Sequence, residues 1–219
     1  MTTAVGDLDD AEPRWPALVA ILAVGGLYDA LPDALTIGPR WLYPTVVLAL
    51  LIPTAVSHHT GHHRANAILG YAVDTVLTLA LAVSVFRLVA ALPARKAAPE
   101  ELLFAAAVLW MTNILVFALW YWRLDAGGPH ARDQRDRHTE GAFLFPQMTM
   151  SDEALKKLGQ EDWSPNFVEY LFLAFNTSTA FSPTDVPVLA RWAKVLMMLQ
   201  ALLSLLIIAL VAARAVNIL

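Results

Sequence analysis

Near the C-terminus, a run of hydroxyl and carboxylate side chains separates two apolar segments. The run covers residues 177–185, and the apolar segments on either side cover residues 167–177 and 191–218. Non-helical backbone is tolerated inside a bilayer only where protein buries it or where it lines a water-filled cavity. The pattern therefore predicts a re-entrant element that lines a path for something polar. The residues expected to line it are Thr177, Thr179, Phe181, Ser182, Thr184 and Asp185.

The same run also fits an ordinary loop between two helices. Serine and threonine hydroxyls commonly hydrogen-bond to nearby backbone groups and cap helix ends. In that interpretation, residues 167–180 form an interfacial helix that lies on the bilayer, and no path for a polar species exists. The sequence leaves both interpretations open.

Three polar side chains lie inside segments that are otherwise apolar: Asp74, Asn113 and Gln200. Asp74 is about nine residues into its segment, so at 1.5 Å per residue it would lie roughly 13 Å deep. Asn113 lies at a comparable depth in the next segment and is the expected partner of Asp74. An intramembrane carboxylate indicates a functional site by default, here a proton- or cation-coupled one. The alternative is a hydrogen-bonded clamp between helices, and Gln200 with Ser204 could likewise line a cavity or bond a neighbouring helix.

Four histidines cluster in a connection between two apolar segments, at His58, His59, His62 and His63. Their spacing resembles one histidine box of membrane di-iron desaturases and hydroxylases. Those enzymes need several boxes, and the other two histidines of this chain stand apart in a charged loop. We therefore expect no enzyme activity. Because imidazole titrates near neutral pH and binds metals, a divalent-metal or pH-sensing role is one hypothesis, and a plain interfacial turn is the other.

The composition is that of a polytopic membrane protein. Of the 219 residues, 58% are hydrophobic and only 16% are charged, with a mean hydropathy of +0.54; a soluble chain has about 45–50% apolar residues. Long apolar runs separated by charged connections predict an all-α integral membrane protein with about five transmembrane helices and a re-entrant helix and loop. The expected spans cover residues 15–31, 41–57, 67–92, 101–122 and 191–218.

The same pattern divides the chain into four parts. They are an acidic N-terminal tail (1–14), a four-helix transmembrane region (15–124), an extramembrane loop with a short helix (125–166), and a re-entrant helix, filter-like loop and inner transmembrane helix (167–219). The short helix is expected at residues 151–158, with Ser151 as N-cap and Gly159 as C-cap. The acidic tail does not resemble a cleavable signal peptide, so we expect the first span to be retained.

Charge and cysteine content exclude several classes of function. The net charge is −4 and no basic stripe exists, so nucleic acid is not an expected partner. The chain has no cysteine and hence no disulfide, thiolate nucleophile or cysteine-ligated metal. No cofactor is expected, and the expected partners are the lipid bilayer and a permeating ion.

The order of elements in the last quarter resembles the pore helix, filter and inner helix of the potassium-channel superfamily, over about 50 of the 219 residues. Thr177 and Thr179 fall on threonines of that family, Asp185 falls on the acid that closes its filter, and Asn176 takes the place of an acid behind it. The resemblance implies a homotetramer around a central axis, with Asn176 bracing the filter.

The filter itself departs from that family. Ser182 and Thr184 stand where the family has glycines, and Pro183 stands where it has tyrosine. Glycine enters backbone conformations that other residues reach only at a cost, and proline fixes φ and lacks an N–H. A potassium-type ladder of carbonyls is therefore not expected. The resemblance instead implies a channel for a partly hydrated monovalent or divalent cation.

The C-terminal half is also similar to a family of bacterial multi-pass membrane proteins that carries no assigned activity. The matching features are 120–122, 145–146, 172–185, 203–204 and 216–218. This resemblance implies a location in the bacterial inner membrane. The leading hypothesis is thus a cation channel with a non-potassium-type filter, and the alternative is a small secondary transporter or non-conducting scaffold centred on Asp74 and Asn113.

Overall fold

The chain folds into a bundle of helices. The computed structural model describes residues 12–91, 99–135, 137–181 and 186–216. Within these ranges there is no strand, only an isolated bridge between Phe143 and Val188. The helices, with 3₁₀-helices marked η, are α1 (Trp15–Asp29), η2 (Asp33–Leu35), α2 (Leu42–His59), α3 (His63–Ala91), α4 (Pro99–Leu124), η3 (Asp125–Gly127), α5 (Pro129–Asp133), η4 (Pro146–Thr149), α6 (Asp152–Leu158), α7 (Phe167–Ala180) and α8 (Arg191–Val216).

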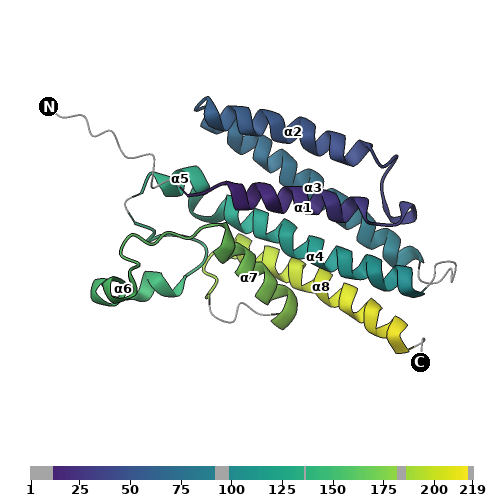
Figure 1. Ribbon diagram of the computed structural model, residues 1–219. Coiled ribbons are helices and arrows are strands. Elements are labelled where there is room, and N and C mark those ends of the chain that lie inside the picture. Colours follow the sequence, from purple (N-terminus) through teal and green to yellow (C-terminus); the bar gives the residue numbers. More distant parts are fainter. Residues whose placement is uncertain (1–11, 92–98, 136, 182–185, 217–219) are drawn as a thin grey trace.

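Helix α4 is the centre of the bundle. It packs against α1, α3, α7 and α8, whereas α2 packs mainly on α3. In Figure 1, α2 and α3 lie on one side of α4, and α7 and α8 lie on the other. Within their most apolar stretches, 67% of α4 is buried against 22% of α8. A helix that is apolar all round suits either a core or a membrane span, so the greater burial of α4 comes from its central place among four other helices.

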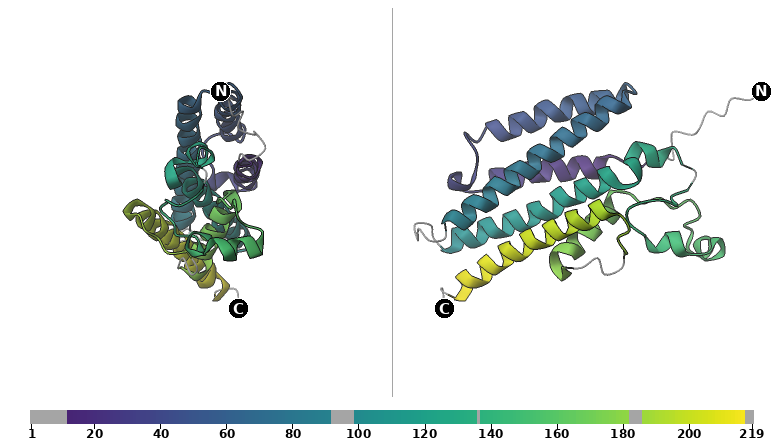
Figure 2. Two further views of the ribbon diagram at one scale, coloured as in Figure 1. Left: turned by 90° about the vertical axis from the view of Figure 1, so that its left-hand side faces the viewer. Right: turned by 180° about the vertical axis from the view of Figure 1, so that it is seen from behind.

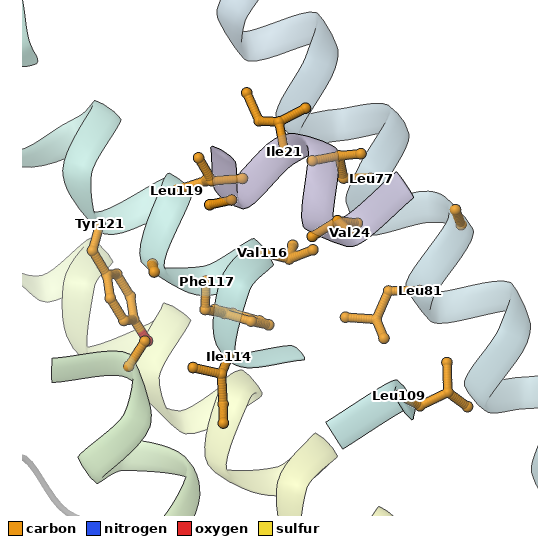
Figure 3. Close-up of a cluster of buried hydrophobic side chains, with 14 of the residues drawn as sticks. Ile21, Val24, Leu77, Leu81, Leu109, Ile114, Val116, Phe117, Leu119 and Tyr121 are labelled. Atoms are coloured by element: carbon orange, nitrogen blue, oxygen red, sulfur yellow. The ribbon is translucent and has the colours of Figure 1, made fainter. Parts of the chain in front are cut away.

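The apolar core joins α1, α3 and α4 (Figure 3). Ile21 and Val24 of α1 gather with Leu77 and Leu81 of α3 and with side chains of α4 such as Val116. These residues are buried to 5% exposure or less. The spacing of three and four residues along each helix sets them on one face, as helical periodicity requires.

Three helical stretches are long and apolar enough to cross a membrane: His63–Ala91, Glu100–Gly127 and Arg191–Ala213. They correspond to the third, fourth and fifth of the predicted spans. The first two predicted spans form shorter apolar helices among the described residues, at Trp15–Asp29 and Leu42–Ser57. The prediction of an all-helical protein with membrane-spanning segments is thus confirmed at the coarse level of three candidate spans.

The predicted loop 125–166 contains more structure than its sequence indicates. Helix α6 occurs as predicted: Ser151 Oγ accepts a hydrogen bond from Ala154 N at 3.3 Å, and Gly159 closes the helix with φ 65°. The loop was expected to contain only that short helix, but residues 129–133 also form a helix, α5, which buries Arg132 to 3% exposure. Figure 1 shows α5 and α6 beyond the end of the bundle at which α1, α7 and α8 begin.

Candidate functional site

Helix α7 begins with a complete N-terminal cap. Asn166 Oδ1 accepts a hydrogen bond from Val168 N at 2.9 Å, and Glu169 Oε2 accepts one from Asn166 N at 2.9 Å. This reciprocal arrangement is a capping box, and it satisfies two backbone donors that the helix itself leaves free. At the other end Phe181 takes a left-handed conformation with φ 55°. Helix α7 is therefore a defined element of 14 residues.

After α7, the chain returns to the end of the bundle from which α7 started. Leu144 N donates to Pro187 O at 2.9 Å, and Leu189 N donates to Ala142 O at 2.8 Å. These bonds hold residues 186–190 against the loop just upstream of α6, and α8 begins directly after them. Figure 2 shows the consequence from behind: α7 and α8 start close together, but α8 continues to the far end of the bundle.

Gln200 of α8 ties the two helices together and to α4. Its Nε2 donates to Ala174 O at 2.7 Å and to Ser178 Oγ at 2.8 Å. Its Oε1 accepts from Tyr121 OH at 2.5 Å. The side chain is fully buried, and one residue thereby fixes the relative position of three helices.

The buried polar contacts of Gln200 form a seam between α4, α7 and α8. Asn113 extends this polar seam toward the next turn of α8. Its Nδ2 donates to Ser204 Oγ at 2.8 Å and to Gln200 O at 3.3 Å. The expected pairing with Asp74 was wrong, because Asn113 points to α8 while Asp74 lies on α3. Of the two roles considered for Gln200 and Ser204, the structure has the bond to a neighbouring helix.

The residues predicted to line a path separate into two groups. Thr177 is buried to 1% exposure and its hydroxyl donates to Leu173 O at 2.8 Å, so it faces the interior of the chain and not an open path. Thr179 and Phe181 are exposed, and Asn176 is half-buried. Ser182, Thr184 and Asp185 lie outside the described residues.

Asp74 forms a buried ion pair that sequence reasoning missed. Arg123 Nε donates to Asp74 Oδ2 at 2.5 Å, with the two side chains 8% and 0% exposed. The guanidinium also lies over the Trp122 ring, with its carbon 5.4 Å from the ring centroid. The guanidinium fits against α3 because residue 70 is a glycine; a Cβ at Gly70 would overlap the guanidinium. The available signal was a glycine one helical turn before an intramembrane acid, since positions i and i+4 share a helix face.

A second charged cluster fastens residues 125–166 to the bundle. Arg132 donates to Trp122 O at 2.8 Å, Asp125 O at 3.0 Å and Glu12 Oε2 at 2.8 Å. Asp125 in turn accepts from Tyr170 OH at 2.7 Å, which links this cluster to the first turn of α7. The arrangement holds α7 in place from the loop side.

His138 lies buried beside that cluster. Its Nε2 is 3.9 Å from Asp125 Oδ2, and its ring contacts those of Phe145 and Trp163. Burial lowers the pKa of His138; Arg132 and Arg135 act in the same direction, and Asp125 opposes them. The neutral imidazole is thus the form that the fold favours.

The histidine cluster, for which a metal site and a plain interfacial turn were both considered, is spread over a turn. His58 and His59 end α2, His62 bonds to Thr60 Oγ1 at 2.9 Å, and the His63 ring stacks on His130 at a centroid distance of 3.5 Å. Within the described part of the chain, no group of three or more His, Cys, Asp or Glu side chains could hold a metal ion. The side chains of His58 and His59 lie outside that description.

Comparisons of the chain with models of protein families, with curated proteins and with solved structures found no match. The two family resemblances therefore rest on the residues quoted from the sequence.

Proposed function

We propose that this chain is a multi-pass protein of the bacterial inner membrane and that its α7–α8 hairpin lines a cation pathway between copies of the chain. Five helices would cross the bilayer: α1, α2, α3, α4 and α8. Helix α7 would enter the bilayer and stop inside it. The observation that carries the proposal is that α7 and α8 start at one end of the bundle while α7 ends beside the middle of α8.

The lengths of α7 and α8 support this placement of α7 in the bilayer. At 1.5 Å per residue, the 14 residues of α7 extend about 21 Å and the 26 residues of α8 about 39 Å. Gln200, which bonds to α7, is nine residues after the start of α8, or about 14 Å along it. The C-terminal end of α7 would therefore lie near mid-depth in a hydrocarbon core about 30 Å thick.

The charge along the path from that depth back to the start of α8 favours a cation. The C-terminal end of a helix carries roughly half a negative elementary charge from its aligned peptide dipoles. Asp185 and the hydroxyls of Ser182 and Thr184 follow within the next few residues. Exposed Thr179 and Phe181 would join them on the pathway, while buried Thr177 and half-buried Asn176 would support it from behind.

One hairpin cannot surround an ion, so the proposal requires an oligomer, and the channel resemblance implies four copies. Both helices offer apolar surface for lipid and for neighbouring copies. On α7 the exposed face includes Val168, Phe172 and Phe175, and on α8 it includes Val195, Met198, Leu199, Leu202 and Leu205. A monomer in both detergent and membrane, measured by native mass spectrometry and by cross-linking in vesicles, would contradict this model.

The chain contains no cysteine, so a single introduced cysteine reports without background. We expect Thr179→Cys to react in membrane vesicles with a water-soluble, membrane-impermeant thiol reagent. Thr177→Cys, two residues away but buried, is the matched control and should stay protected. Leu202→Cys, exposed on α8 and facing lipid in this proposal, should also stay protected. If Thr179→Cys is as unreactive as Leu202→Cys, no aqueous path reaches the end of α7.

Flux measurements separate a channel from a transporter. In reconstituted liposomes, Asp185→Asn should change cation flux or selectivity. The double variant Asp74→Leu/Arg123→Met, which removes the buried pair together, should have little effect because the pair lies away from the hairpin. A transporter centred on Asp74 would give the opposite pattern, with flux coupled to a proton gradient.

A further inference from the structure

A pocket opens on the side of the bundle away from α7 and α8. Its volume is about 560 Å³, within the range of roughly 300–1,000 Å³ that is usual for small-molecule sites. The ends of α1, α2, α3 and α4 that lie toward α5 form its walls. The side chains that matter for its chemistry are Leu18, Ile21, Leu51, Ala55, Trp122 and Arg123.

The pocket combines apolar walls with two arginines, Arg14 and Arg123. Leu18 and Ile21 of α1 and Leu51 of α2 supply hydrocarbon surface. Arg123 lies on the wall formed by α3 and α4 and reaches Gly70 and Asp74 of α3. The lining therefore matches a molecule that has an apolar body and one polar end.

Arg123 has hydrogen-bonding capacity that the described chain does not use. Its Nε donates to Asp74, but its two terminal nitrogens donate to no residue that the structure describes. An arginine carries five N–H donors in a rigid fork, and two parallel donors match a carboxylate. The Trp122 ring and the Gly70 backbone, which lie against the guanidinium, hold that fork in one orientation.

The other charges near the pocket are already engaged. Glu12, the carboxylate of the lining, accepts hydrogen bonds from Arg14, Arg132 and Trp122 Nε1. Arg14 is also paired with Asp133. Because opposite charges balance in this cluster, selectivity must come from the directed N–H groups of Arg123 and not from a net positive field.

We propose that this pocket binds a single-chain amphiphile with a carboxylate head, such as a fatty acid. The carboxylate accepts two hydrogen bonds from the terminal nitrogens of Arg123, and the hydrocarbon chain lies between α1 and α2 along Leu18, Ile21 and Leu51. This site is independent of the proposed cation pathway, since none of its lining belongs to α7 or α8.

Native mass spectrometry of the full chain in a non-ionic detergent tests the proposal. Dodecanoate is titrated against the protein, and dodecanol, which has the same chain and no carboxylate, is the matched ligand. We expect dodecanoate to saturate at one molecule per chain and dodecanol to bind at least about tenfold more weakly, because hydrogen bonds to a charged group are lost.

Variants locate the binding. Ala55→Phe fills the pocket from an exposed position of α2 without touching the ion pair, and it should weaken dodecanoate binding at least about tenfold, because the acyl chain loses its place against the pocket walls. Asp74→Asn/Arg123→Gln removes the fork and its partner together and should do the same. Arg87→Gln removes an arginine that bonds to Thr36 O outside the pocket, and binding should be unchanged. Equal binding of dodecanol and dodecanoate, or unchanged binding in Ala55→Phe, would overturn the proposal.

Discussion

Two polar regions lie inside this bundle and are built in different ways. The seam between α4, α7 and α8 uses neutral groups, centred on Gln200 and Asn113. The contact between α3 and α4 uses a charged pair, Asp74 and Arg123. A hydrogen bond between membrane helices contributes about 0.6 kcal/mol on average, whereas removing one partner of a buried ion pair costs about 3–5 kcal/mol. The neutral seam can thus lose one bond at a time, but the two charged partners can only be lost together.

The largest expected effect comes from breaking the charged pair on one side. Arg123→Met leaves Asp74 buried without its counter-charge and should lower the free energy of unfolding by about 3–5 kcal/mol. The double variant Asp74→Leu/Arg123→Met should recover most of that loss, because two apolar side chains replace the pair. Equilibrium unfolding in mixed micelles of a non-ionic detergent and dodecyl sulfate measures both. If the double variant is as unstable as the single one, the arginine acts through contacts other than Asp74.

The space beside the pair gives the next prediction. In Gly70→Ala the new methyl group overlaps the Arg123 guanidinium, and overpacking of this kind costs about 1–3 kcal/mol. Gly25→Ala is the matched control, because a Cβ at Gly25 meets nothing within 4 Å. The control should be neutral or more stable by up to about 1 kcal/mol from helix propensity. The same unfolding assay compares the two variants. Equal effects would mean that the Arg123 side chain adopts another conformation without loss of stability.

The two regions also differ in how far the sequence predicts them. Helix α8 and the caps of α6 follow from local pattern: apolar length for the first, Ser151 and Gly159 for the second. Asp74 and Asn113 were recognised as buried polar residues from their depth alone. Depth does not say which face of a helix a residue occupies or which neighbour that face meets, so their partners were assigned wrongly.

The partner of Arg123 could not be predicted from its local sequence either. An arginine that follows a run of aromatic residues at a helix end is typical of an interfacial side chain that reaches toward water. In the structure it reaches back to Gly70 and Asp74, because α3 extends past the end of α4 on this side. The stagger between two helices is set by packing over their whole length, and no local motif encodes it.

The neutral seam should respond more weakly than the pair. Gln200→Met keeps the volume but removes the bonds to Ala174 O, Ser178 Oγ and Tyr121 OH, and we expect a loss of about 1–2 kcal/mol. Leu202→Met on the exposed face of α8 is the control and should be close to neutral. Loosening of α7 has a second readout: a cysteine at Thr177 should become reactive in the Gln200→Met background. Continued protection of that cysteine would show that the loop cluster alone holds α7.

The smallest effect concerns pH and the loop end of α7. Since burial lowers the pKa of His138, the folded state binds fewer protons than the unfolded state. Stability is therefore fully present above the unfolded pKa of about 6.5 and is lost as the pH falls below it, by at most about 1.4 kcal/mol per pH unit for one proton. His138→Phe, which keeps a ring between Phe145 and Trp163, should flatten the dependence between about pH 7 and 5. His62→Phe, at an exposed position, should leave it unchanged. The free energy of unfolding is measured at each pH. If His138→Phe keeps the pH dependence of the wild type, the loss of stability comes from carboxylates. The comparison would then be between two charged regions and one neutral seam.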